Sequence, residues 1–143
     1  MSTSGLLSPI TINTLVVRNR AVMPSMLTNF ATKGGDVTER LIHYYAERAK
    51  GGVGMNIVEA TYVARSGNSF DFGLGISDDF MIKGLSNLTE AVHRHDGKIA
   101  IQLQHGGRFG NPPTSGCPRL LVSMIPGLAP TENSRVMDAD DIE

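Results

Sequence analysis

The sequence predicts an α/β fold built around a parallel sheet, because short apolar runs alternate with helix-like runs along its 143 residues. The strand-like runs are residues 20–23, 55–63 and 98–104. Segments 36–50 and 77–97, which separate them, carry the spacing of an amphipathic helix. About 150 residues make one ordinary domain, so we expect a single domain over residues 1–143.

The N-terminal part predicts a hairpin over residues 10–17, with the turn at Asn13 and Thr14. The apolar run that follows, 20–23, ends at Pro24, because proline has no amide hydrogen to donate within a sheet.

The first helix is expected to begin at Asp36, with Glu39 completing a capping box, and to end at Gly51 and Gly52. Its apolar stripe is Leu41, Ile42, Tyr45, Ala46 and Ala49.

The second helix is expected to open at Ser77–Asp79 and to close at Gly97. Its buried stripe would be Ile82, Leu85, Leu88, Ala91 and Val92. Residues 105–136 are expected to form a long loop, and the acidic residues 138–143 resemble the first turn of a helix. We therefore expect the chain to stop inside an element, as a piece of a longer protein would.

Composition excludes several classes of protein. The net charge is -1 with no basic stripe, so we expect no nucleic-acid partner. No apolar run approaches the roughly 20 residues that span a bilayer, and residues 1–5 lack the features of a signal peptide. Cys117 is the only cysteine, which predicts a reducing, cytoplasmic location and no thiolate metal site.

Ligands of parallel α/β folds gather at the carboxyl ends of the strands. Those ends carry residues 24–28, 59–61 and 102–108, which supply main-chain groups, small side chains and neutral amides but no carboxylate dyad. Such a site suits a flat, uncharged heteroaromatic ring, and Gln102 can both donate to and accept from an imide edge. The alternative is that Gln102 is an ordinary polar residue inside a barrel.

Three separated motifs in order resemble the old yellow enzyme family of NADH:flavin oxidoreductases. They are NRAVMPSMLTNFA, VTERLIHYYAERAKGGVGMNIVEATYV and GKIAIQLQHGGR, and the likeness covers roughly residues 5–143. More narrowly, the chain is similar to the branch of 2,4-dienoyl-CoA reductase, enoate reductase and bile-acid-inducible reductase.

The resemblance implies an FMN-bearing TIM (β/α)8 barrel, of which residues 1–143 would be the N-terminal half. The three strands would be the first three of eight, and the hairpin would close the bottom of the barrel.

The resemblance also assigns the cofactor contacts. The backbone amide of Ala60 would reach the flavin O4/N5 edge, and Gln102 would bind the O2/N3 edge. One side of the flavin ring would be lined by Pro24, Ser25, Met26 and Leu27. Relatives often place Thr or Cys at position 27, and Leu27 cannot form their hydrogen bond.

Other site residues are less specific. Thr28 and His105 would face the substrate, although His105 could instead hold its loop by a hydrogen bond, and Arg108 would organise the long loop by ion pairing. Glu59 could bind a ligand or a cation, or be a satisfied polar residue inside the barrel. The resemblance places the catalytic residues beyond residue 143 and implies no metal ligand in this chain.

The implied activity is that of an FMN-dependent ene-reductase, which uses NADH or NADPH to reduce an activated C=C bond of a small unsaturated substrate. An iron–sulfur cluster and FAD would belong only to a longer parent protein. The alternative is a non-enzymatic half-barrel that binds no flavin alone. Open sheet edges predict association, either as a homo-oligomer or with the missing half-barrel.

Overall fold

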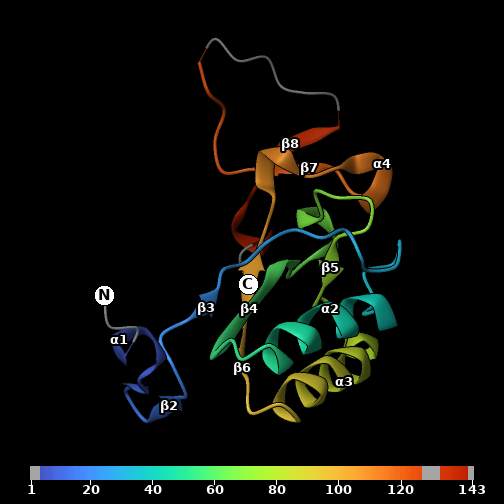
Figure 1. Cartoon of the computed structure of the whole chain (residues 1–143). Coiled ribbons are helices and arrows are strands. Elements are labelled where there is room, and N and C mark those ends of the chain that lie inside the picture. The colour runs from blue at the N-terminus through green and yellow to red at the C-terminus, as the bar shows by residue number, and fades with distance from the viewer. Residues whose placement is uncertain (1–3, 127–132, 142–143) are drawn as a thin grey trace.

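The computed structural model describes residues 4–126 and 133–141, and its centre is a parallel sheet whose two longest strands lie side by side (Figure 1). Strand β4 (Met55–Tyr62) pairs with β6 (Lys98–Gln104) from end to end. The helices α2 (Glu39–Lys50) and α3 (Ile82–His93) lie together on one face of this pair (Figure 1). The two long predicted strands and the alternating order of strands and helices are confirmed.

The opposite edge of β4 is paired only at its ends. The short strand β3 (Val22–Met23) pairs with the beginning of β4, and β5 (Leu74–Gly75) pairs with its end. Residues 57–60 therefore have no strand neighbour on that edge among the described residues. The chain that leaves β3 passes beside this gap, which matters for the site below.

The N-terminal segment consists of a short helix and the predicted hairpin. Helix α1 (Ser4–Leu7) precedes β1 (Ile10–Ile12) and β2 (Leu15–Val17), which are antiparallel. Asn13 turns the chain with a φ of 53°, a left-handed conformation that asparagine tolerates.

Helix α2 (Glu39–Lys50) begins three residues later than the sequence predicted. Thr38 is its N-cap, and the Thr38 hydroxyl accepts from the amide of Leu41 at 3.2 Å. Asp36 is not the cap, because its carboxylate accepts from the Thr32 hydroxyl at 2.9 Å and belongs to the preceding turn. The predicted C-terminal stop is confirmed, and Gly52 supplies the positive φ there, at 100°.

Arg18 ties the ends of both helices together. Its guanidinium donates to the carbonyls of Ala49 at 2.5 Å and Val53 at 2.9 Å, which lie at and after the end of α2. It also donates to the carbonyl of His95 at 2.8 Å, just after α3. A cation among helix C-terminal carbonyls is favoured both by hydrogen bonding and by the helix dipole.

Helix α3 (Ile82–His93) follows a 3-10 turn at Asp79–Met81. Leu88, Ala91 and Val92 are buried as predicted, but Ile82 is exposed because it stands in the first turn, where nothing described covers it. The core between helices and sheet is formed by Ala31, Leu41, Tyr45, Ala49, Val58, Leu74, Leu88 and Val92.

The predicted long loop over residues 105–136 contains more structure than expected. It holds α4 (Pro112–Ser115) and two short parallel strands, β7 (Arg119–Leu121) and β8 (Ser134–Val136). The three-residue strands β7 and β8 lack the short connecting turn that marks the hairpin of β1 and β2, so no local signal in the sequence indicates them. The predicted helix start near the C-terminus is a 3-10 turn at Ala139–Asp141, and residues 142–143 lie outside the described part.

Within the described residues, no helix has the length and apolar character needed to cross a membrane.

Candidate functional site

Three strand ends that the sequence placed in one site meet in the structure. The hydroxyl of Ser25, after β3, donates to Oε1 of Gln102 near the end of β6 at 2.6 Å. Ala60 of β4 lies directly beside Gln102 in the register of the two strands. Ser25, Ala60 and Gln102 therefore share one edge of the sheet.

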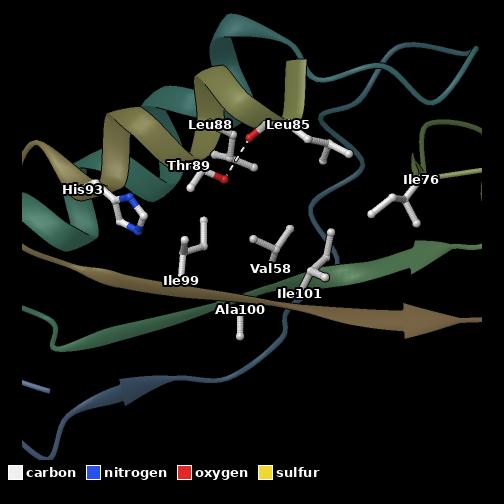
Figure 2. A pocket seen from close by; sticks show the side chains of 9 residues that line it. All are labelled: Val58, Ile76, Leu85, Leu88, Thr89, His93, Ile99, Ala100 and Ile101. Carbon is white, nitrogen blue, oxygen red and sulfur yellow. Dashed lines mark hydrogen bonds between the residues drawn. The ribbon is translucent and has the colours of Figure 1, made fainter. Parts of the chain in front are cut away.

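The side chains of β6 alternate between the two faces of the sheet. Figure 2 shows Ile99 and Ile101 pointing toward α3, whereas Ala100 points to the opposite side. By strand alternation Gln102 shares the face of Ala100, away from the helices. This is the face that becomes the interior when such a sheet closes into a barrel.

The loop after β3 presents an open, largely apolar surface. Pro24 is exposed, and Met26 and Leu27 keep 55% and 39% of their surface accessible. Large apolar side chains exposed beside a polar amide are typical of a ligand-binding surface. The Leu27 side chain is aliphatic, so it can contribute only van der Waals contacts to this surface.

The polar groups at this edge fit a flat ring that has both carbonyl and N–H groups. Because Ser25 donates to Oε1 of Gln102, the Nε2 hydrogens of Gln102 are left to donate to a carbonyl oxygen. A second lone pair on Oε1 can still accept from an imide N–H. The pyrimidine edge of an isoalloxazine has this combination, so the residues present fit FMN.

Glu59 immediately precedes Ala60 and is fully buried. Its Oε2 accepts from the amide of Thr28 at 3.0 Å and from the Thr28 hydroxyl, while Oε1 is buried with no partner among the described residues. Burial raises the pKa of the Glu59 carboxyl above its ordinary value, and the two bonds from Thr28 oppose that shift. Of the two expectations for Glu59, the structure favours a polar residue held within the fold.

A bulge in β4 accompanies this arrangement. The register with β6 shifts between Val58 and Ala60, so Glu59 is the extra residue. The amide of Glu59 donates to the hydroxyl of Tyr45 on α2 at 2.8 Å. Burial, with the carboxyl of Glu59 nearby as a smaller cause, raises the pKa of Tyr45, so its hydroxyl stays protonated.

The Thr28 hydroxyl is already engaged. Its single hydrogen is donated to Glu59, and its oxygen accepts from the amide of Phe30 at 3.2 Å. Contact between Thr28 and substrate stays a prediction, and it would have to use the methyl group or the remaining lone pair.

His105 joins two loops at the ends of β4 and β6. Its Nδ1 accepts from the amide of Gly107 at 3.0 Å, which places the proton of the neutral ring on Nε2. Nε2 lies 3.2 Å from the hydroxyl of Ser66 and can donate to it. The expected loop-holding role therefore has a structural basis, while a substrate contact stays a prediction.

Arg108 differs from its expectation. Its guanidinium donates to the carbonyl of Ser123 at 3.4 Å, and no ion pair of Arg108 is found among the described residues. Arg108 still connects two parts of the segment 105–136, but it does so by donating to a neutral carbonyl and not by an ion pair.

A hollow of about 290 Å³ lies elsewhere, between α3 and the helix-facing side of the sheet (Figure 2). None of the predicted flavin residues lines it. Its walls are Val58, Ile76, Leu85, Leu88, Thr89, His93, Ile99, Ala100 and Ile101. This hollow belongs to the helix–sheet interface, and we assign the candidate site to the strand ends instead.

In the described ranges, no three His, Cys, Asp or Glu side chains are grouped closely enough to hold a metal ion. Sequence reasoning missed the Glu59–Thr28 and Ser25–Gln102 pairs, although it placed each of the four residues at a strand end. A hydrogen-bonding partner for Glu59 could have been expected from the sequence, because Glu59 lies in an otherwise apolar strand and a buried carboxyl needs hydrogen-bond donors.

Comparison with known proteins shows the family of the chain. Residues 5–143 match the NADH:flavin oxidoreductase / NADH oxidase family. The chain is 43% identical over 117 residues to an NADH oxidase of Thermoanaerobacter brockii, and this alignment covers 80% of this chain and 18% of the relative. It is 40% identical over 100 residues to an NADH:acrylate oxidoreductase of Vibrio harveyi, and this alignment covers 70% of this chain and 10% of the relative.

The fold agrees as well. The solved old yellow enzyme homologue of Zymomonas mobilis superposes with a TM-score of 0.84 at 29% identity, covering 96% of this chain and 41% of that one. The fold is thus the N-terminal part of a TIM barrel. The chain spans less than a fifth of the length of the two curated relatives.

A family match along almost the whole chain, and a fold shared with a solved old yellow enzyme homologue, lead to one conclusion: the chain belongs to the NADH:flavin oxidoreductase / NADH oxidase family, whose members are flavin oxidoreductases.

Proposed function

We propose that this chain supplies the N-terminal half of the FMN site of an NAD(P)H-dependent ene-reductase. The observation that carries the proposal is the convergence of Ser25, Ala60 and Gln102 at one sheet edge. When bound, FMN would take a hydride from NADH or NADPH and deliver it to an activated C=C bond. The family resemblance places the residues that would hold the substrate carbonyl and donate the proton beyond residue 143, while Thr28 and His105 are the candidate substrate contacts within this chain.

Each strand end has a separate part in holding the ring. Gln102 donates through Nε2 and accepts through Oε1 at the pyrimidine edge, and Ser25 holds its amide in that orientation. The backbone of Ala60 faces the O4/N5 edge. Pro24, Met26 and Leu27 pack against the ring and exclude water from it, since their side chains are exposed here and mainly apolar.

The substrate is a small unsaturated molecule. An NADH:acrylate oxidoreductase among the relatives supports reduction of a C=C bond next to a carbonyl. Within the family we favour the branch of 2,4-dienoyl-CoA, enoate and bile-acid-inducible reductases, on the three motifs quoted above. The single cysteine, Cys117, favours action in the cytoplasm.

The sheet needs further strands to close. Among the described residues β6 pairs only with β4, which leaves its other edge open beside the hollow lined by Ile99 and Ile101. Open edges of this kind attract another strand. We infer that the remaining barrel strands, or failing those a second copy of the chain, cover this edge.

Purification with excess FMN tests the proposal. A protein that joins residues 1–143 to the remaining barrel strands should keep a flavin absorption band in the blue part of the visible spectrum after desalting, because it would carry both halves of the proposed site. A colourless joined protein would contradict the proposal. The 143-residue chain alone provides the comparison: if only the chain is colourless and oligomeric, it is the half-barrel that binds no flavin by itself.

A further inference from the structure

The loop of residues 24–30, here called the tip loop, carries four of the proposed FMN contacts but does not form a strand beside β4. The edge of β4 from Ile57 to Ala60 has no strand neighbour among the described residues. Without ladder hydrogen bonds, another group must set the distance between the tip loop and Ala60.

The side chain of Glu59 is that group. Both of its hydrogen bonds go to Thr28 of the tip loop, from the amide at 3.0 Å and from the hydroxyl. These are the hydrogen bonds that the described residues provide between the tip loop and β4. The carboxyl is fully buried, so water does not compete with Thr28 for Oε2.

The two flanks of the tip loop, on either side of Thr28, are held by other elements than β4. Ser25 donates to Gln102 on β6 at 2.6 Å, and the carbonyl of Phe30 accepts from the hydroxyl of Thr38, the N-cap of α2, at 2.5 Å. Glu59 thus fixes the middle of a loop whose two flanks are fixed elsewhere. On its own strand it sits at the bulge, directly before the residue whose backbone faces the flavin.

We propose that Glu59 is a positioning residue for FMN, acting through Thr28 to hold the tip loop at the distance from Ala60 that the ring requires. The proposal rests on the proposed function. It assigns no contact between Glu59 and the flavin: the carboxyl acts by fixing where Ser25 and Met26 stand relative to Ala60.

Four variants of the native gene product test it, with the dissociation constant of FMN measured by quenching of flavin fluorescence. Thr28→Val removes the hydroxyl donor and should weaken FMN binding about tenfold, the equivalent of one hydrogen bond to a charged group. Thr28→Ser keeps the hydroxyl and should stay within about twofold of the native protein. Glu59→Gln keeps an oxygen that accepts from Thr28 and should stay within about threefold.

The matched control is Thr89→Val on α3. It also removes a threonine hydroxyl, which donates to the carbonyl of Leu85 at 2.9 Å, but far along the chain from the tip loop. It should leave the FMN dissociation constant within about twofold. Native-like affinity in Thr28→Val, or equally weak binding in Thr28→Ser, would overturn the positioning role.

Hydrogen exchange of the flavin-free protein separates this inference from the proposed function. Thr28→Val should speed exchange of amides 25–30, and Thr28→Ser should not. Unchanged exchange in Thr28→Val would overturn the clamp itself. If exchange changes as expected but the native protein binds no FMN, the proposed function fails and the contact between Glu59 and Thr28 stands as a structural one only.

Discussion

At the scale of single residues, the site combines exposed neutral groups with one buried carboxyl. The proximity of Ser25, Ala60 and Gln102 could be predicted, because parallel strands bring their carboxyl ends to one edge of the sheet. The partner of Glu59 could not, because the bond depends on how a loop folds back over a gap in the strand pairing.

The buried carboxyl makes stability depend on pH. Burial raises the pKa of Glu59 above 4.5 in the folded protein, so ionising it costs folding free energy. That cost is absent below the ordinary carboxyl pKa, where folded and unfolded chains are both protonated, and fully present above the raised value. We therefore expect the native protein to lose stability, relative to Glu59→Gln, as the pH rises through this window.

Urea unfolding at a series of pH values between 4 and 8 measures this difference. Glu90→Gln, on the exposed side of α3, is the matched control and should follow the native profile. Parallel profiles for the native protein and Glu59→Gln would show that the carboxyl carries no such cost.

At the scale of elements, the helices and long strands follow from periodicity, whereas their exact starts follow from competition between neighbouring side chains. Asp36 is a good capping residue, yet Thr32 engages its carboxylate and Thr38 caps α2 instead. The short strands β5, β7 and β8 could not be predicted, because each pairs with a strand distant in the sequence and lacks the adjacent turn that marks the equally short strands β1 and β2.

Arg18 connects the C-terminal ends of α2 and α3, because its guanidinium donates to the carbonyls of Ala49, Val53 and His95. Arg18→Met keeps the apolar stem but leaves these acceptors without the guanidinium, so it should lower the free energy of unfolding by roughly 2–4 kcal/mol. Arg20→Met is the control, since Arg20 is exposed and its Nε donates to the hydroxyl of Ser8 at 3.3 Å. Equal unfolding midpoints in urea for the two variants would refute this role of Arg18.

At the scale of the whole molecule, two helices cover one face of the sheet (Figure 1). The candidate site lies at the carboxyl ends of the strands, and strand alternation places Gln102 on the face away from the helices. The helix-facing residues form the core, whereas Pro24, Met26, Leu27 and Gln102 at the strand ends stay exposed. The barrel itself was expected from family resemblance and agrees with the solved neighbours, because alternation of strands and helices alone fits several parallel folds. That residues 1–143 form half of one FMN-binding domain stays a prediction.

We propose that the amide of Gln102 hydrogen-bonds to the pyrimidine edge of FMN. The most direct test is to measure the FMN dissociation constant of the Gln102→Leu variant in the native gene product. Losing a donor and an acceptor at an imide edge should cost roughly 1–3 kcal/mol of binding free energy, or about 5–150-fold in affinity. Thr89→Val on α3 removes a hydroxyl that donates to the carbonyl of Leu85 at 2.9 Å, away from the strand ends, and should change the affinity little. An unchanged dissociation constant in Gln102→Leu, with the native protein binding FMN, would contradict the account.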